Sequence, residues 1–287
     1  MLIAYRQWSA PCLLYLQISM NDILVINDNT ADMWQVTVFA YNIAAKLGRN
    51  IIMADTVKTA KTVVVKKHAE YAEEPMDAPM YKDENSLMLT LDAERNFKPR
   101  MDTLDASALN KRGLATYTYT NNISMIVQGV SGIRGKNYSF DPALLLSKIC
   151  CPVLLVPEYY SGRVVNRAAY LADMRYCQTS ILNYVDHLSE RSVLLAHNCY
   201  DGLPDLNNDY ANDLFNRVIV PKVRSSKLFF GYIRETNMGK IIDTLSNGVN
   251  IDLLACVNRQ FHFNRLVGEN FPALPGSLVI PLLVFPS

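Results

Sequence analysis

Two short apolar stretches of this chain end in the same way: CPVLLVP at Cys151–Pro157 and IPLLVFP at Ile280–Pro286, 129 residues apart. Upstream of them, NISMIV at Asn122–Val127 and NIDLLA at Asn250–Ala255 are 128 residues apart. Two matches with nearly the same offset indicate an internal repeat, in which each copy is one structural unit. The chain of 287 residues is therefore interpreted as two copies of one plan.

The beginnings of the two copies agree as well. An apolar run at Ile23–Asp28 and another at Ala168–Asp173 each end in an aspartate. A helix is predicted after each run, because apolar residues then recur with the spacing of one helix face. These residues are Val36, Ala40, Ile43, Ala44 and Leu47 in the first copy, and Cys177, Ile181, Tyr184, Val185 and Leu188 in the second.

The remaining elements are predicted to alternate in the same order. Strands are expected at 51–54, 98–104, 123–128 and 152–156, with helices at 107–120 and 142–148, and the second copy repeats them as strands at 193–196, 227–233, 253–257 and 281–285 and a helix at 237–246. Short apolar strands that alternate with helices predict parallel sheets covered on both faces. The predicted fold class is α/β, with two tandem doubly wound, Rossmann-like domains of five parallel strands each.

The repeat also suggests where the domains begin and end. We expect an N-terminal extension at 1–19, a first domain at 20–157, a linker at 158–167 and a second, degenerate domain at 168–287. The stretch 57–96 is irregular, basic at its start and then acidic. It is interpreted as a solvated loop with a short helix near 86–95, or alternatively as a basic patch for a phosphate or a partner.

Composition excludes several classes of protein. Half of the residues are hydrophobic, 19% are charged and the net charge is +1, which is typical of a globular chain and gives no electrostatic footprint for nucleic acid. No run approaches the roughly 20 apolar residues of a membrane-spanning helix, and no signal-peptide pattern is found at 1–19. The six cysteines include no C-x-x-C motif, which disfavours a zinc site and indicates a reducing compartment. We expect a cytoplasmic protein.

Several motifs, in order and in duplicate, are similar to those of the universal stress protein family in its tandem form. The strand ILVIND ends at Asp28, and the helix after it closes on Gly48 with the spacing of that family. MIVQGVSG at Met125–Gly132 resembles the family's fourth strand and Gly-x-x-Gly loop, and LLACVNR at Leu253–Arg259 repeats the plan. The resemblance covers residues 20–287 and implies two adenine-nucleotide-hydrolase-type domains that form an intramolecular pseudo-dimer.

The resemblance also implies a nucleotide site, with Asp28, Thr56, Gly129 and Gly132 as the candidate residues. Glycines let a backbone approach phosphates, and a carboxylate at a strand end can accept a hydrogen bond from a base or ribose. ATP-binding members continue for nine residues after the second glycine and then have Gly with Ser or Thr. This chain has Pro142–Ala143 there, and proline offers no N–H to a phosphate. Any ATP, with Mg²⁺, is expected in the first domain only.

The second copy departs further from this motif. Val257 and Asn258 stand where the first glycine would be, and Asp173 alone remains. Catalytic motifs are also missing, because the four histidines form neither H-x-x-x-H nor H-E-x-x-H, and no G-x-S-x-G is present. His197, at the end of a predicted strand, is interpreted as a core histidine rather than a base.

Three hypotheses about function follow. The first is a non-catalytic stress-response protein that binds an unknown protein partner or ligand, with a degenerate nucleotide site. The second is a sensor that binds an adenine nucleotide in the first domain, which Asp28 and Gly129-x-x-Gly132 would favour. The third is a nucleotide-cleaving enzyme, for which the sequence offers no catalytic group. No metal ion, nucleic acid or membrane is expected as a partner.

Overall fold

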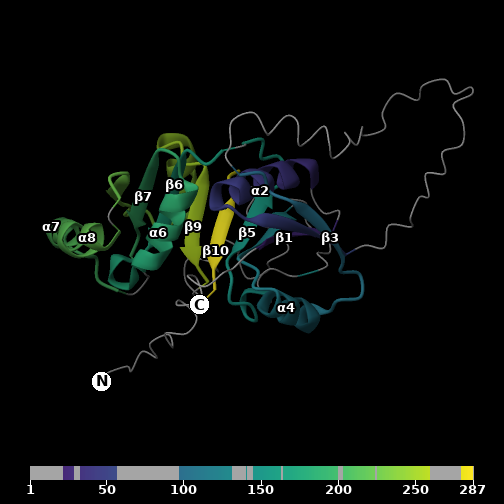
Figure 1. Ribbon diagram of the computed structural model, residues 1–287. Helices are drawn as coiled ribbons and strands as arrows, with labels where there is room; N and C mark the ends of the chain where they lie inside the picture. The colour runs from purple at the N-terminus through teal and green to yellow at the C-terminus, as the bar shows by residue number, and fades with distance from the viewer. Residues whose placement is uncertain are drawn as a thin grey trace, which may run out of the picture.

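One mixed sheet of ten strands organises the molecule, with strand order β3-β2-β1-β4-β5-β10-β9-β6-β7-β8 (Figure 1). The computed structural model describes residues 22–28, 33–56, 97–130, 140, 145–162, 164–199, 203–223, 225–258 and 279–286. Every neighbouring pair of strands is parallel except β5 with β10, which is antiparallel. The sheet therefore consists of two five-stranded parallel halves, and the predicted α/β fold class is confirmed.

The first half of the sheet contains β1 to β5. Its elements are β1 (Asp22–Asn27), α2 (Met33–Leu47), β2 (Asn50–Asp55), β3 (Met101–Asp105), α4 (Lys111–Thr120), β4 (Met125–Val130) and β5 (Val153–Pro157). The second half has β6 (Arg167–Ala172), the 3-10 helix η3 (Met174–Tyr176), α6 (Thr179–Leu188), β7 (Ser192–His197), α7 (Asn208–Leu214), the π-helical turn η4 (Phe215–Ile219), α8 (Val220–Val223), β8 (Leu228–Tyr232), α9 (Met238–Asp243), the π-helical turn η5 (Thr244–Gly248), β9 (Leu253–Val257) and β10 (Leu282–Phe285).

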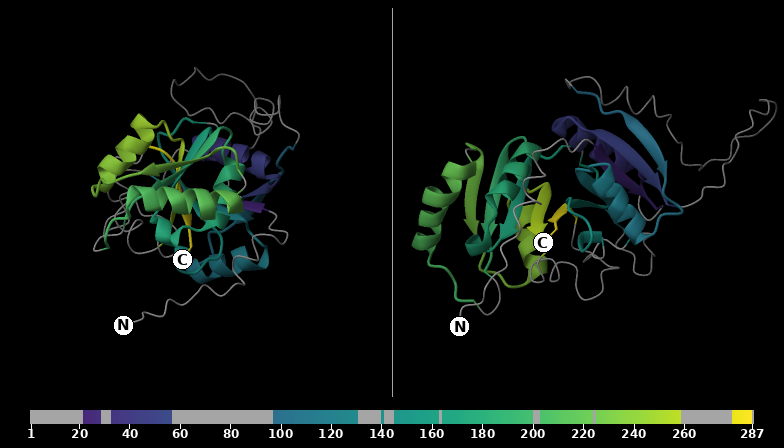
Figure 2. Two further views of the ribbon diagram at one scale, coloured as in Figure 1. Left: turned by 90° about the vertical axis from the view of Figure 1, so that its left-hand side faces the viewer. Right: turned by 60° about the horizontal axis from the view of Figure 1, so that its bottom comes forward.

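The two halves meet where β5 of the first half lies beside β10 of the second half (Figures 1 and 2). β10 is drawn in yellow in Figure 1. Leu154 stands opposite Leu283 in this pair, and both side chains are fully buried. β5 and β10 lie in the CPVLLVP and IPLLVFP stretches, and such continuous apolar runs are typical of strands that are buried on both faces of a sheet. The residue bounds of the two predicted domains remain a prediction, since both halves share this sheet.

Helices cover both faces of the sheet, because side chains alternate along each strand. In β1, Leu24 and Ile26 belong to the apolar cluster under α4 and α9, while Ile23 and Val25 belong to the cluster under α2, α6, η4 and α8. α2 and α4 accordingly lie on opposite sides of the first half (Figure 1). Each cluster contains residues from both halves, so the core is continuous across the joint.

The helix predicted at 107–120 is confirmed as α4, although Gly113 and the TYTYT run at 116–120 favour strand locally. The side-chain oxygen of Asn110 accepts a hydrogen bond of 2.8 Å from the backbone N–H of Gly113, which caps the helix. Leu114 is fully buried against the core. Capping and burial together outweigh the local strand preference.

The helical stretch from α7 to α8 was not among the elements predicted from sequence. Its buried residues recur every four positions: Ala211, Phe215, Ile219 and Val223. The apolar spacing of a helix is therefore present in the sequence at 208–223. The predicted extension at 1–19, the irregular stretch 57–96 and the first residues of the helix at 142–148 lie outside the described residues.

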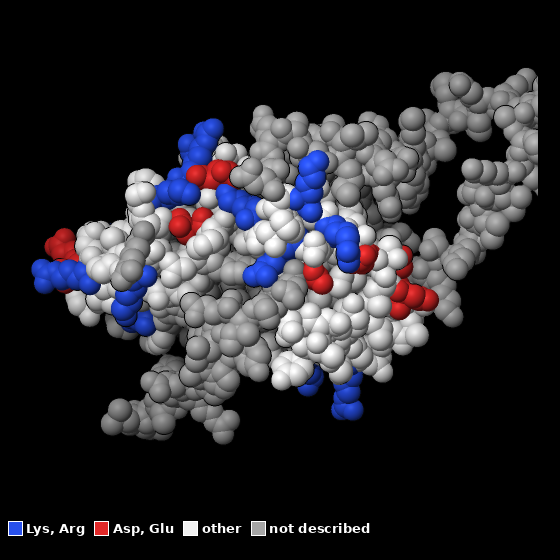
Figure 3. All heavy atoms as spheres, viewed as in Figure 1, with Lys and Arg blue, Asp and Glu red and all other residues white. Residues whose placement is uncertain are grey.

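Charged side chains of both signs are interspersed on the face of the molecule drawn in Figure 3. This distribution agrees with the net charge of +1 and leaves no large basic field on that face. Among the described helices, none has the length and apolar character needed to cross a membrane.

Candidate functional site

The carboxyl ends of β1, β2 and β4 lie next to one another and bring three of the four candidate residues to one edge of the sheet. Asp28 follows β1, Thr56 follows β2, and Gly129 is in β4. Open parallel sheets hold ligands at this edge. Gly132 lies outside the described residues.

The Asp28 carboxylate is buried at the end of β1, with only 7% of the residue exposed. Its Oδ2 accepts a hydrogen bond of 3.3 Å from Nε2 of Gln128, a fully buried residue of β4. The same Nε2 donates at 3.0 Å to the backbone carbonyl of Phe140. A side-chain amide of the chain itself therefore lies against the carboxylate that a nucleotide would need.

Phe140 lies next to Gln128, on the side of its amide. Its residue is 2% exposed, and its ring belongs to the apolar cluster under α4. A ligand that reached Asp28 from this direction would have to displace both the amide of Gln128 and a core aromatic residue. On the side of Gln128 and Phe140, the described residues therefore leave no open approach to the Asp28 carboxylate.

Thr56 has a structural role at the neighbouring strand end. Its backbone N–H and its hydroxyl both donate to the carbonyl of Asn27, at 3.0 Å and 3.1 Å. The side-chain amide of Asn27 donates to Oδ1 of Asp55 at 2.8 Å. These bonds tie the ends of β1 and β2 together.

Gly129 lies inside β4, opposite Val156 of β5, rather than in a loop after the strand. The residue is buried in the sheet. Gly129 is paired with Val156 on one side, whereas the register of β4 with β1 ends at the preceding residue, Gln128. Gly129 is therefore a residue of the strand, and the loop that follows β4 lies outside the described residues.

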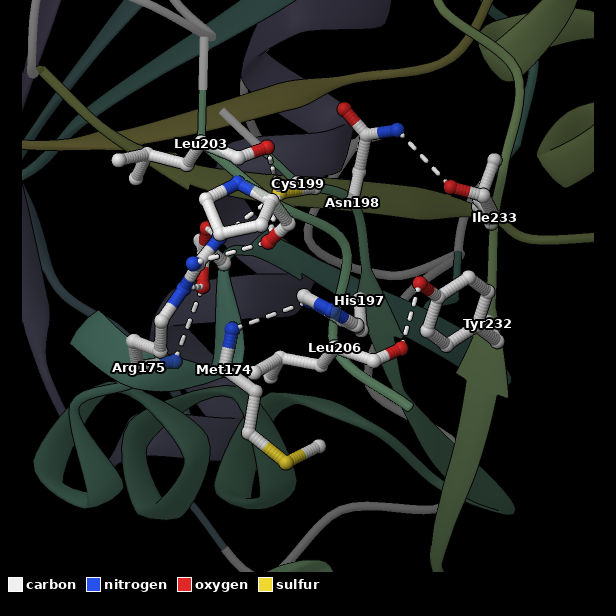
Figure 4. Close-up of polar contacts among 11 residues, drawn as sticks. Met174, Arg175, His197, Asn198, Cys199, Leu203, Leu206, Tyr232 and Ile233 are labelled. Carbon is white, nitrogen blue, oxygen red and sulfur yellow. Dashed lines mark hydrogen bonds and ion pairs between the residues drawn. The ribbon is translucent and has the colours of Figure 1, made fainter. Parts of the chain in front are cut away.

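The equivalent edge of the second half is occupied by an ion pair (Figure 4). Asp173 is fully buried and accepts hydrogen bonds from Nε of Arg175 at 2.9 Å and from Nη2 of Arg175 at 2.6 Å. Its Oδ1 also accepts from the backbone N–H of Arg175 at 3.0 Å, which caps η3. Such a two-pronged contact is the strongest geometry of an arginine with a carboxylate.

The other contacts of the Arg175 guanidinium go to the loop after β7. Nη1 donates to the carbonyl of Pro204 at 3.1 Å, and Nη2 contacts the Sγ of Cys199 at 2.7 Å (Figure 4). Burial raises the pKa of the Cys199 thiol even though the guanidinium opposes this. The cysteine is therefore held as a thiol at neutral pH, and a thiol is a poor nucleophile.

His197, at the end of β7, is fully buried beside this ion pair. Its Nδ1 accepts a hydrogen bond of 3.1 Å from the backbone N–H of Met174, and its ring meets that of Tyr232 edge to face at 4.9 Å. The bond to Nδ1 identifies the neutral tautomer that carries its proton on Nε2, and no hydrogen-bond partner of Nε2 is found in the part of the chain that the structure describes. Burial lowers the pKa of His197, although the nearby Asp173 carboxylate opposes this.

This histidine predicts a loss of stability in mild acid. Because the pKa of His197 is lower in the folded chain than its ordinary 6.5, the unfolded chain binds a proton more readily. The free energy of unfolding should therefore fall as the pH drops below about 6.5, by up to about 1.4 kcal/mol per pH unit for one such proton. His197→Asn, measured by urea unfolding between about pH 7 and about pH 5, should reduce that slope.

His187→Asn is the matched control, since His187 is exposed on α6. The control should keep the slope of the unaltered chain. An equal slope in His197→Asn and in the unaltered chain would contradict the assignment of this acid sensitivity to His197.

Sequence reasoning named Asp28 and Asp173 but missed the residues that bond them. Gln128 is a polar residue inside the apolar run MIVQGV, which indicates a buried amide that needs partners. Arg175 stands two residues after Asp173, close enough to pair with it. Within the described residues, no group of three or more His, Cys, Asp or Glu side chains could hold a metal ion.

Comparison with solved structures gives the same fold. A universal stress protein from Archaeoglobus fulgidus superimposes with a TM-score of 0.56 and 13% identity, covering 94% of this chain and 97% of that one. A candidate universal stress protein from Pseudomonas aeruginosa gives 0.50 and 11%, covering 94% of each chain. No protein-family model and no curated protein matches the sequence. At these identities the likeness concerns the fold, which is that of the universal stress proteins.

Proposed function

We propose that this chain, which has the fold of universal stress proteins, is a non-catalytic protein of the stress response that acts by binding a partner rather than by using a nucleotide. One observation supports this proposal above the others. Both strand-end carboxylates are already bonded by side chains of the chain, Asp28 by Gln128 and Asp173 by Arg175. A nucleotide would have to compete with these contacts for the carboxylate oxygens.

The chemistry of the described groups agrees with a non-catalytic role. Cys199 is a thiol whose pKa is raised by burial, and burial lowers the pKa of His197. The two groups are not aligned as nucleophile and base, because Nδ1 of His197 accepts a hydrogen bond from a backbone N–H and its Nε2 meets no partner among the described residues. We therefore assign Cys199 and His197 a role in packing and not in catalysis.

Calorimetric titration with ATP and Mg²⁺ tests the proposal. We expect no heat of binding at millimolar ATP and no release of phosphate or pyrophosphate. Binding that is lost in Asp28→Ala would instead establish the nucleotide sensor, and steady turnover by the pure protein would establish an enzyme. Asp22→Ala, at the opposite end of β1, is the control for a general effect of losing a carboxylate from this strand.

A further inference from the structure

β8 forms one end of the sheet, and in the described part of the chain no other strand pairs with its outer side. Its sequence, LFFGY, contains neither a charged residue nor a proline. In the left view of Figure 2, which looks onto this end, the strand runs across the front between the helices of the two faces. An apolar edge with unpaired peptide groups is a template for another strand.

The opposite end of the sheet is built differently. β3 has the sequence MDTLD, and its Asp102 and Asp105 are exposed. Acidic side chains gather at the right of Figure 3, where Figure 1 places β3. Charges on an edge strand prevent pairing with a second chain, so β3 is protected and β8 is not.

The hydrogen bonds with β7 define which peptide groups of β8 point outward. The carbonyl of Lys227 accepts from Val193 at 2.9 Å, and the N–H of Ile233 donates to His197 at 2.8 Å. Alternate residues of a parallel strand bond to the same neighbour, so positions 227, 229, 231 and 233 all face β7. Leu228, Phe230 and Tyr232 therefore direct their N–H and C=O groups away from the sheet.

We propose that β8 pairs with β8 of a second copy of this chain, antiparallel, about a twofold axis at Phe230. In this register Leu228 lies opposite Tyr232 of the partner subunit, and Phe230 lies opposite its own counterpart. All three outward residues then belong to hydrogen-bonded pairs, which satisfies every outward peptide group of the strand. A twofold contact of this kind closes on itself and yields a dimer rather than a fibre.

Side chains complement each other in the same register. Phe229 is 57% exposed, and it stands opposite Gly231 of the partner subunit in a non-hydrogen-bonded pair, where side chains approach most closely. An aromatic ring over a cross-strand glycine covers backbone that the glycine leaves open. Each dimer contains this pairing twice, which a shift of the register would lose.

Contacts with the rest of the second half also hold β8 in its strand conformation. The ring of Phe230 stacks on that of Phe215 at 5.3 Å, and the Tyr232 hydroxyl donates to the carbonyl of Leu206 at 3.0 Å. An edge held in its strand conformation loses little entropy when it pairs. The contact is short, so we expect a weak dimer that forms in the micromolar range.

Sedimentation velocity of the full chain from about 1 µM to about 100 µM tests the proposal. We expect a shift from monomer to dimer with rising concentration, and Phe229→Lys should abolish it. Tyr119→Lys is the matched control, because Tyr119 is 69% exposed on α4, which connects β3 and β4 of the first half. Its replacement should leave the dimer intact. A chain that stays monomeric throughout, or a dimer that persists in Phe229→Lys, would overturn the proposal.

Amide exchange followed by NMR tests the register itself. The amides of Leu228, Phe230 and Tyr232 should exchange quickly in dilute protein and become protected as the dimer forms. The amides of Phe229 and Gly231 should be protected in dilute protein as well as in the dimer, since they bond to β7. Concentration-independent exchange at Phe230 in a chain that dimerises would place the contact elsewhere and refute β8 pairing.

Discussion

Replacement of Arg175 by methionine is expected to lower the free energy of unfolding by about 3 kcal/mol or more. The Asp173 carboxylate is fully buried, and Arg175 supplies its counter-charge through contacts of 2.9 Å and 2.6 Å. Removal of one partner leaves the other as an uncompensated buried charge, which costs far more than the loss of a surface pair. Urea unfolding followed by circular dichroism measures the difference.

Two further variants separate the buried pair from a general effect of losing an arginine. Arg217→Met removes a pair with Asp213 of 2.6 Å in which both side chains are exposed, and it should change stability little. The double variant Asp173→Asn/Arg175→Met should recover much of the loss, because asparagine keeps an oxygen to cap η3 and carries no charge. An Arg175→Met chain as stable as Arg217→Met would contradict the interpretation.

Much of the fold could be predicted because it is encoded in repeated local patterns. The offset between CPVLLVP and IPLLVFP, together with the apolar face of α2, predicts strands and helices within each copy. Parallel strands joined by helices have few available topologies, but the order of the strands and the antiparallel joint of β5 with β10 are seen only in the structure. The α4 helix shows the limit of this approach, since a single cap at Asn110 and the burial of Leu114 decide it.

The state of the candidate site could not be predicted in the same way. Asp28 is at the expected strand end, but Gln128, which bonds it, is 100 residues later in the sequence. Which buried amide meets which carboxylate depends on the packing of β1 beside β4, and no local pattern reports that packing. The bond between Gln128 and Phe140 likewise depends on how the chain returns after β4.

The joint between β5 and β10 predicts that both halves unfold together. Leu283→Ala should lower the free energy of unfolding by about 2–5 kcal/mol, because this side chain is fully buried opposite Leu154 and a cavity remains in its place. In a Trp8→Phe background the remaining tryptophan is Trp34 in α2, so the fluorescence does not arise in the half that carries the substitution. We therefore expect this mutation to move the tryptophan transition in urea as far as the circular dichroism transition.

Ile242→Ala distinguishes this coupling from a local disturbance at the joint. Ile242 is buried in α9, in the cluster under α4 and α9, whereas Leu283 belongs to the cluster on the other face of the sheet. If one cooperative unit spans both halves, Ile242→Ala also moves the tryptophan transition. A tryptophan transition that stays in place in both variants, while circular dichroism shows an earlier step, would mean that the halves unfold separately. The continuous core across β5 and β10 argues for the single transition, since exposing either half would strip apolar residues of the other from their partners.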